Sequence, residues 1–285
     1  MPHLTVHSSA KVNLCLDVLG ARPDGYHELR TVFERISLAD TITLKSVKTG
    51  KITIHCSHPH VPKGPKNLVY KAALMLKQDF SISAGLDINI IKNIPVAAGL
   101  AGGSSNAAAV LSGLNRLWRL GLGQKELVNY ASCLGSDVAF FVYDVSFALG
   151  TGRGEIITPL KSPAKLWHLI VTPKVKMYTR EVFARLKLKL TNKKDNVNIL
   201  LPFLRKGDVC RLAGALSNDL EPAILSLRPD FAYLKEKLLD AGALSVCFSG
   251  SGPSIYGLVR SQQHAFDLRA RMDKRFAQVF VVSTL

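Results

Sequence analysis

The sequence lacks any apolar run long enough to form a membrane-spanning helix, which needs about 18 residues. Its opening, Met1-Pro2-His3-Leu4, shows no basic patch followed by an apolar stretch, so we expect no signal peptide. The five cysteines form no Cys-x-x-Cys pair, and their odd number argues against a disulfide framework. We therefore expect a cytoplasmic protein with reduced thiols and no membrane partner.

Acidic residues are scarce, with 21 Asp and Glu against 37 Lys and Arg, which gives a net charge of +16. Most of the excess follows Gly150, and the densest basic stretch runs from Lys174 to Lys194. Such a field favours anionic partners such as nucleic acid or phosphorylated metabolites, although a solvated basic face without a ligand is an equally good explanation for most of these residues. No aromatic-interleaved basic motif of the RNA-binding type occurs, so a nucleic-acid-binding protein is a minor alternative and we expect no nucleic-acid partner.

The composition is that of a globular protein, with 47% hydrophobic and 20% charged residues, and a chain of 285 residues predicts two domains. Glycine and proline concentrate between residues 150 and 165. We place the boundary there, which gives an N-terminal domain over residues 1–155 and a C-terminal domain over residues 156–285.

Hydrophobic periodicity predicts an α+β fold. Residues 11–18 alternate between apolar and polar side chains, which predicts a strand with one buried face and a second face that carries Lys11 and Asn13. Helical spacing predicts helices over 67–78, from Ser104 to a C-cap at Gly121, and over 125–134 with an end at Gly135. Further elements are expected as strands at 41–44, 51–54, 86–91, 168–172, 244–248, 254–259 and 279–282, and as helices at 229–239 and 262–276.

One glycine-rich segment lies between an alternating strand and an amphipathic helix. It reads Pro95-Val96-Ala97-Ala98-Gly99-Leu100-Ala101-Gly102-Gly103-Ser104-Ser105-Asn106. Small residues let backbone N–H groups approach an anion, and the helix start adds unpaired donors and the positive end of a dipole. The segment matches neither G-x-x-x-x-G-K-[ST] nor G-x-G-x-x-G, and the simpler reading is a flexible loop with a serine N-cap. We favour a phosphate site.

This segment resembles the central motif of the GHMP kinases, a family of small-molecule kinases. The stretches 10–14, 24–29, 134–138 and 249–254 resemble further motifs of the family, in the expected order. The resemblance implies a two-domain GHMP kinase fold, with an N-terminal nucleotide-binding α/β domain, a C-terminal ferredoxin-like α+β domain, and ATP and Mg²⁺ as cofactors. Asp24-Gly25-Tyr26-His27 narrows the resemblance to kinases that phosphorylate the 2-hydroxyl of a cytidine diphosphate-linked methylerythritol in the non-mevalonate isoprenoid pathway. A kinase for another small alcohol is the alternative.

The resemblance also implies roles for single residues. Asp137 would orient or deprotonate the substrate hydroxyl, and Lys11 would hold that carboxylate ionised and stabilise developing negative charge. Without the resemblance, the simpler interpretation of Asp137 is a helix N-cap, and that of Lys11 is a solvated strand residue. The implied substrate-binding residues are Asn13, Tyr26, His27 and Phe183, and the implied ATP-binding residues are Pro95 to Ser105, Lys66 and Asn67, although Asn67 is equally well a simple helix cap.

Further features of the chain concern the metal site, the turn at residues 249–252 and the oligomeric state. Asn106 stands where related chains commonly have an acidic residue. No acidic Mg²⁺ ligand stands out, so the ATP phosphates would carry the metal, with help from Ser104 or Ser105. The turn Ser249-Gly250-Ser251-Gly252 is rich in N–H donors and is either part of the substrate region or a plain hairpin turn. We expect a monomer or a weak homodimer.

Overall fold

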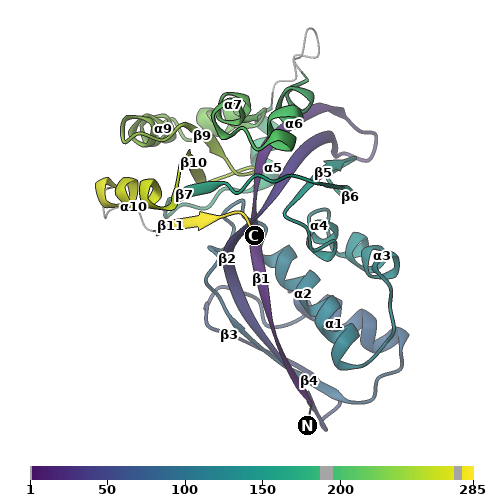
Figure 1. Ribbon diagram of the computed structural model, residues 1–285. Helices are drawn as coiled ribbons and strands as arrows, with labels where there is room; N and C mark the ends of the chain where they lie inside the picture. Colours follow the sequence, from purple (N-terminus) through teal and green to yellow (C-terminus); the bar gives the residue numbers. More distant parts are fainter. Residues whose placement is uncertain (1, 187–194, 273–277) are drawn as a thin grey trace. The chain divides into compact units, whose positions relative to one another are not determined.

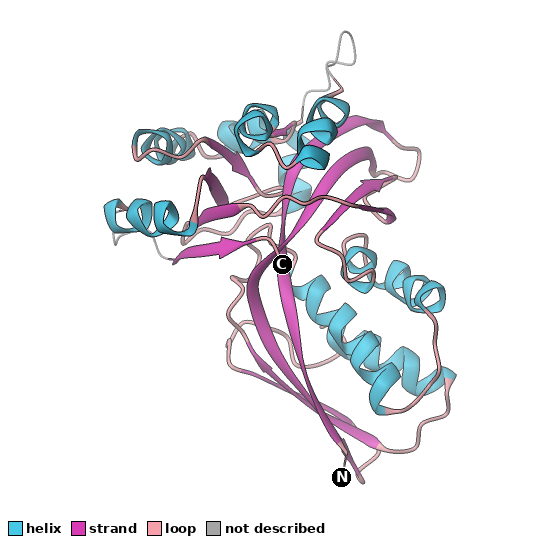
Figure 2. Ribbon diagram, viewed as in Figure 1, coloured by secondary structure: helices cyan, strands magenta, loops and turns pink. Residues whose placement is uncertain are grey.

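A computed structural model describes residues 2–186, 195–272 and 278–285, and it shows an α+β protein (Figures 1 and 2). The chain forms two compact units. Unit 1 comprises the residues up to Ala10, Leu38–Val96 and Ala101–Val145, and unit 2 comprises Lys11–Ser37, Ala97–Leu100 and Ser146–Leu285. Two long strands, β1 (His3–Ala21) and β2 (His27–Val47), contribute residues to both. Within the described residues, no helix has the length and apolar character needed to cross a membrane.

Unit 1 packs helices against a sheet. Strand β3 (Ile52–Cys56) pairs in parallel with β4 (Gly85–Ile91), and β4 pairs antiparallel with the last part of β2. Helix α2 (Gly102–Leu117) packs against α1 (Leu68–Asp79), α3 (Gln124–Leu134) and α4 (Val138–Val142). A Cβ on Gly113 would lie 2.7 Å from Leu44 Cδ1, so α2 and β2 approach each other closely at this glycine.

Unit 2 contains a four-stranded antiparallel sheet in the order β11-β7-β10-β9, formed by Gln278–Ser283, Trp167–Thr172, Ile255–Val259 and Ser245–Phe248. This is the ferredoxin-like strand order expected for the C-terminal part. Helices α9 (Asp230–Asp240) and α10 (Gln262–Arg271) pack on this sheet. The same unit holds α5 (Thr179–Arg185), α6 (Asn196–Lys206), α7 (Val209–Ala215), α8 (Glu221–Leu227), β5 (Phe147–Thr151), β6 (Ile156–Leu160) and β8 (Ser217–Asn218).

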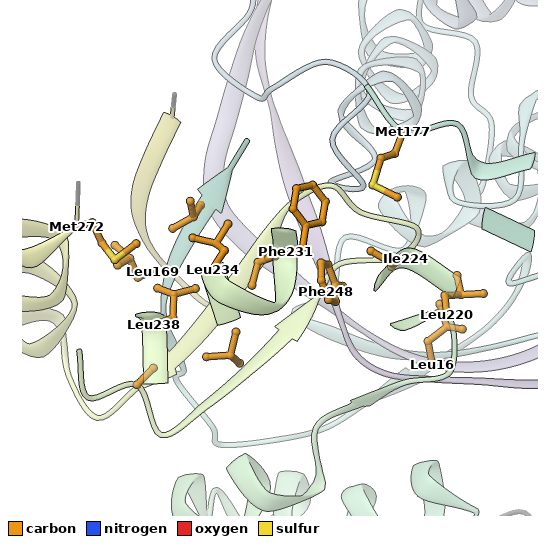
Figure 3. Close-up of a cluster of buried hydrophobic side chains, with 14 of the residues drawn as sticks. Leu16, Leu169, Met177, Leu220, Ile224, Phe231, Leu234, Leu238, Phe248 and Met272 are labelled. Carbon is orange, nitrogen blue, oxygen red and sulfur yellow. The ribbon is translucent and has the colours of Figure 1, made fainter. Parts of the chain in front are cut away.

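The hydrophobic core of unit 2 joins helices to the ferredoxin-like sheet (Figure 3). Phe231, Leu234 and Leu238 repeat at helical spacing along α9, and all three are buried in one cluster with Leu169 and Phe248 of the sheet. Leu16 of β1 joins the same cluster. The periodicity that predicted a helix over residues 229–239 therefore marks the face that packs on the sheet.

The polar face expected on β1 is buried as well, which contradicts the expectation of one buried face. Lys11, Asn13, Cys15 and Asp17 are each less than 5% exposed. Their polar groups have partners inside unit 2: for example, Asp17 accepts hydrogen bonds from Asn196 Nδ2 (2.8 Å) and from Val197 N (3.2 Å) at the start of α6. Alternation identified the strand correctly, but polarity was a wrong guide to exposure because these groups are hydrogen-bonded.

Strand β2 is 21 residues long, where periodicity predicted a strand only over residues 41–44. Buried acidic residues interrupt its apolar pattern. Glu34 is fully buried and accepts hydrogen bonds from Thr284 Oγ1 (2.7 Å) and from His168, whose Nε2 lies 2.8 Å from its carboxylate. A carboxylate that is satisfied in this way can occupy the interior of a sheet, and sequence alone gives no sign of its partners.

Helix boundaries show one further difference. Helix α2 begins at Gly102, two residues before the expected start, and its C-cap is Trp118 rather than Gly121. Helices α1 and α3 confirm the predictions, including Asn67 as an N-cap and Gly135 as a C-cap. Helix α10 ends at Arg271, and the rest of its predicted range, 273–276, lies outside the described residues. All five cysteines are free, as expected.

Candidate active site

The glycine-rich loop leads from β4 to α2 and has an unusual backbone. Ala97, Gly99 and Ala101 have φ values of 55°, 76° and 54°, in the left-handed region that only glycine adopts without strain. Ala101 is the N-cap of α2, no side chain caps the helix, and its first turn carries no acidic residue. The serine N-cap reading is therefore wrong, because Ser104 and Ser105 lie inside the helix. The donors of its first turn are left available for an anion.

The middle of this loop is held by the turn between β9 and β10. Ser249 Oγ donates to Gly99 O at 2.9 Å, and Ser254 N donates to Ala98 O at 3.3 Å. A Cβ on Gly99 would overlap Ser249 O and would lie 2.9 Å from Gly252 O. The turn at residues 249–252 is thus a hairpin turn, and it also fixes the part of the loop that belongs to unit 2.

Lys11 and Asn13 form the centre of a polar cluster in unit 2. Lys11 Nζ donates to Asn13 Oδ1, Asn13 Nδ2 donates to Thr31 Oγ1, and Tyr256 Oη donates to Asn13 O, each at 2.7 Å. Lys11 is only 4% exposed, so its reading as a solvated strand residue is wrong. A Cβ on Gly250 would lie 3.5 Å from Asn13 Oδ1 and 3.6 Å from Lys11 Nζ, so the turn closes over this cluster.

Aromatic and basic side chains gather at another part of unit 2. The rings of His27 and Phe183 lie 4.9 Å apart at an angle of 35°. Tyr26 is 55% exposed, and the Arg153 guanidinium lies 4.7 Å from the centre of its ring. The structure thus brings His27 together with Phe183, and it adds Arg153, which the sequence did not single out. Glycine at position 152, with a φ of 70°, shapes the turn that presents Arg153.

The remaining predicted residues lie in unit 1. Asn67 caps α1 by accepting from Val69 N at 2.9 Å, and it donates to Pro62 O at 2.6 Å, while the neighbouring Lys66 is exposed. Asp137 is half-buried at the N-cap position of α4, but its side chain makes no capping hydrogen bond. The capping explanation for its carboxylate is therefore wrong. Its pairing with Lys11 stays a prediction.

A metal ion would find few protein ligands. Among the described residues, no group of three or more His, Cys, Asp or Glu side chains could hold one. The Ser105 hydroxyl is buried and accepts a hydrogen bond from Ser8 Oγ at 2.7 Å, whereas Ser104 is half-buried. Of the two serines suggested by sequence, Ser104 is thus the more exposed.

Two family models match the chain. Residues 67–144 match the N-terminal domain of the GHMP kinases, and residues 200–278 match their C-terminal domain. The 4-diphosphocytidyl-2-C-methyl-D-erythritol kinase of Geobacillus kaustophilus (strain HTA426) is 45% identical over 282 residues, which cover 96% of each chain. The chain belongs to the GHMP kinases. It is therefore a small-molecule kinase that uses ATP, and its fold class is the one the sequence predicted.

Other relatives and solved structures agree with this GHMP kinase assignment. The 4-diphosphocytidyl-2-C-methyl-D-erythritol kinase of Bacillus anthracis is 39% identical over 99% of this chain and 97% of its own. A crystal structure of 4-(cytidine 5'-diphospho)-2C-methyl-D-erythritol kinase superposes with a TM-score of 0.83 at 30% identity, covering 98% of each chain. The L. major mevalonate kinase, at 16% identity and a TM-score of 0.77, shares the fold.

Proposed function

We propose that this GHMP kinase transfers the γ-phosphoryl group of ATP to the 2-hydroxyl of 4-diphosphocytidyl-2-C-methyl-D-erythritol, a step of the non-mevalonate isoprenoid pathway. The relatives at 39–45% identity carry the name of this kinase and align over nearly the whole chain. The observation that carries the proposal within the chain is the buried cluster beneath the turn at Gly250, because Asn13 holds the ammonium of Lys11 in a fixed place although that lysine is less than 5% exposed.

The reaction needs positioning and charge neutralisation rather than covalent chemistry. In our proposal the oxygen of the 2-hydroxyl forms a bond to the γ-phosphorus, and the Asp137 carboxylate accepts the proton that this hydroxyl loses. The bond from that phosphorus to the β,γ-bridging oxygen breaks, and ADP leaves. Lys11 would be the cationic partner of the Asp137 carboxylate and would stabilise the negative charge that develops. Asn13, which already holds the Lys11 ammonium, would bind the polyol.

ATP would lie along the glycine-rich loop, with its phosphates on the uncapped start of α2 and its adenine near Lys66 and Asn67. We propose Mg²⁺ as the partner of the ATP phosphates, with Ser104 as the nearest protein ligand; the ion would neutralise phosphate charge. The cytosine ring would be held by Tyr26, His27 and Phe183. Because His27 and Phe183 lie 4.9 Å apart, they offer one shared aromatic surface and leave no room for a base between them.

Three wider proposals stay with this function. We place the kinase in the cytoplasm as a monomer or weak homodimer, with no nucleic-acid partner. The basic stretch that motivated the nucleic-acid alternative runs to Lys194, and its residues 187–194 lie outside the described residues. Anionic substrates account for part of the charge of +16.

The direct test mixes purified protein with Mg-ATP and the cytidylyl substrate and follows ADP release and a product heavier by one phosphoryl group. Asp137→Asn is the matched control, since it keeps the shape of the side chain and removes its basicity. We expect its kcat to fall at least ~10²-fold, the low end for a positioned acid–base group. Turnover of the wild-type chain no faster than that of Asp137→Asn would reject the proposal, and turnover only with other alcohols would assign the kinase to a different substrate.

A further inference from the structure

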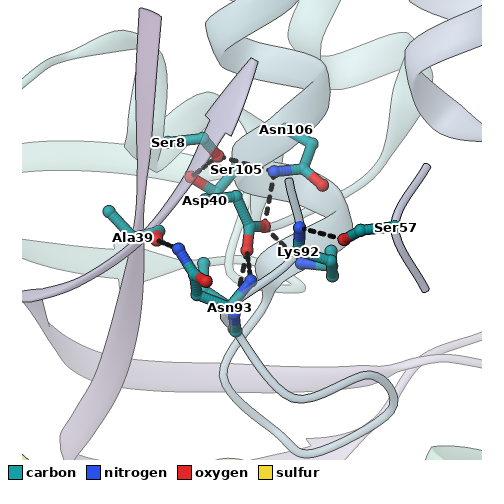
Figure 4. A network of polar contacts seen from close by, with 9 residues as sticks. Ser8, Ala39, Asp40, Ser57, Lys92, Asn93, Ser105 and Asn106 are labelled. Carbon is teal, nitrogen blue, oxygen red and sulfur yellow. Dashed lines mark hydrogen bonds and ion pairs between the residues drawn. The ribbon is translucent and has the colours of Figure 1, made fainter. Parts of the chain in front are cut away.

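A buried acidic residue lies beneath the start of α2 in unit 1, where neither the motifs nor the proposed mechanism uses it (Figure 4). Asp40 of β2 is fully buried. Its Oδ1 accepts from the backbone amides of Asn93 (2.7 Å) and Ile94 (2.8 Å), and its Oδ2 accepts from Lys92 Nζ and from Asn106 Nδ2 (2.8 Å). One carboxylate therefore gathers the end of β4 and the start of α2.

The Asp40 cluster contacts α2 in two places, one at Asn106 and one at Gly102. Asn106, in the second turn of α2, donates to Ser8 Oγ (2.9 Å), and Ser8 in turn donates to Ser105 (2.7 Å). At the first residue of the helix, a Cβ on Gly102 would lie 2.8 Å from Lys92 Nζ and 2.9 Å from Ile94 Cγ2. The Lys92 ammonium thus lies directly against the backbone that begins the phosphate-binding helix.

The charges of this pair are enclosed. The Lys92 side chain is 4% exposed and that of Asp40 is fully buried, so water screens neither of them. As long as both are present, the pair adds no net charge beneath the donors of α2. A lone carboxylate at the same place would repel a polyanion, and a lone ammonium would attract it.

We infer that Asp40 and Lys92 are positioning residues for the nucleotide. They set the backbone amides at the start of α2 in place and keep the protein beneath them electrically neutral, so that the helix start binds the ATP phosphates. The inference rests on the proposed binding of ATP at this loop. A purely structural ion pair would stabilise the fold without any preference for the sign of the charge that is removed.

The test is therefore a charge cycle: Lys92→Met, Asp40→Asn and the double variant, each assayed for the KM of ATP, the KM of the alcohol and the Kd of ADP measured without turnover. We expect Lys92→Met to raise the KM of ATP and the Kd of ADP at least ~5-fold, since it leaves a carboxylate facing the phosphates. Asp40→Asn keeps an oxygen for both backbone amides and leaves a lone ammonium beneath the helix start, so it should not raise these constants and should lower them by up to ~2-fold. The double variant should return to within ~2-fold of the wild type, because it removes both charges.

Lys77→Met is the matched control. Lys77 is another partly buried lysine of unit 1, near the C-terminal end of α1, and its Nζ donates to the carbonyl oxygens of Ile82 and of Ala84 (2.7 Å). We expect it to lower the melting temperature and to leave the constants for nucleotide unchanged. If Lys92→Met does not fold, Asn106→Ala replaces it, because it keeps the ion pair and breaks the hydrogen bond from α2 to Asp40, while the contact of Lys92 with Gly102 remains. It should raise the KM of ATP a few-fold without changing that of the alcohol.

The outcomes separate this inference from the proposed function. Lys92→Met behaving like Lys77→Met, or raising the KM values of both substrates equally, overturns the positioning role. An effect of the same size from Asp40→Asn and Lys92→Met, without recovery in the double variant, overturns the role of charge. Failure of the proposed function looks different: the wild-type chain would then release no ADP with the cytidylyl substrate, whereas the Kd of ADP in the wild type and the three variants would still report on the positioning role.

Discussion

The two polar clusters of the molecule, one in each unit, are held together in different ways. In unit 1 the carboxylate of Asp40 is the centre of the cluster. It accepts hydrogen bonds from two backbone amides, from an ammonium and from an amide side chain. In unit 2 the cluster around Asn13 is a chain of hydrogen bonds that includes the neutral groups of Thr31 and Tyr256. Removing one partner of a buried ion pair costs far more than removing one neutral hydrogen bond, so the two clusters should respond to mutation on different scales.

The largest expected effect is that of Asp40→Ala. It leaves Lys92 buried without its counter-ion and removes the acceptor of two backbone amides, so the free energy of unfolding should fall by about 3–5 kcal/mol. Urea denaturation measures it. Asp230→Ala is the surface control, since Asp230 pairs with Arg228 while 58% exposed, and we expect a loss below ~1 kcal/mol. Equal losses of unfolding free energy in the two variants would contradict the expected difference between buried and exposed charges.

Gly99→Ala should come next. Its Cβ would overlap Ser249 O in a backbone of φ 76°, so both strain and overlap oppose it, and the free energy of unfolding should fall by at least ~2 kcal/mol. Gly103→Ala is the control, because a Cβ there meets nothing within 4 Å and the residue is helical. Its stability should match that of the wild type or exceed it slightly. A stable Gly99→Ala would show that the turn at residues 249–252 does not hold the loop.

Tyr256→Phe tests a hydrogen bond between neutral groups in the Asn13 cluster of unit 2. The hydroxyl it removes is the donor to Asn13 O, so the free energy of unfolding should fall by about 1 kcal/mol, well below the loss in Asp40→Ala. Denaturation under the same conditions gives both numbers. A loss as large as that of Asp40→Ala would mean that the cluster of unit 2 acts as one cooperative network rather than as separate bonds.

The smallest effect is expected in the chemistry of the thiols. Burial raises the pKa of the Cys247 thiol to about 12, and burial also strongly raises that of Cys15, whose carbonyl oxygen accepts from Thr31 Oγ1 of the Asn13 cluster (2.7 Å). Because the thiolate is the nucleophile, iodoacetamide at pH 8 should label the exposed Cys133 and Cys210 and leave Cys15 and Cys247 unmodified, as read by mass spectrometry. Labelling of Cys15 in Tyr256→Phe would report that the cluster has opened, whereas labelling in the wild type would contradict its burial.

The sequence predicted the features that depend on local patterns, and it did not predict the two polar clusters. The glycine-rich junction of a strand and a helix, the helix caps at Asn67 and Gly135 and the strands of the C-terminal part are local patterns, and the structure confirms them. Asp40 could not be found in this way, because its partners lie 52 to 66 residues further along the chain. Tyr256 is 243 residues from Asn13, and no sequence pattern near either residue predicts the hydrogen bond between them. Sequence periodicity marks apolar faces, whereas buried polar groups depend on distant partners.

The central claim is that the Asp40 cluster of unit 1 positions the nucleotide and that the aromatic residues of unit 2 bind the alcohol substrate. A pair of variants, one in each unit, tests this claim most directly. The KM of ATP and the KM of the cytidylyl substrate are measured for Lys92→Met and for Tyr26→Ala. We expect Lys92→Met to raise only the KM of ATP, at least ~5-fold, and Tyr26→Ala to raise only that of the cytidylyl substrate, about tenfold for the loss of one stacked base. Both KM values rising together in either variant would contradict this division of roles.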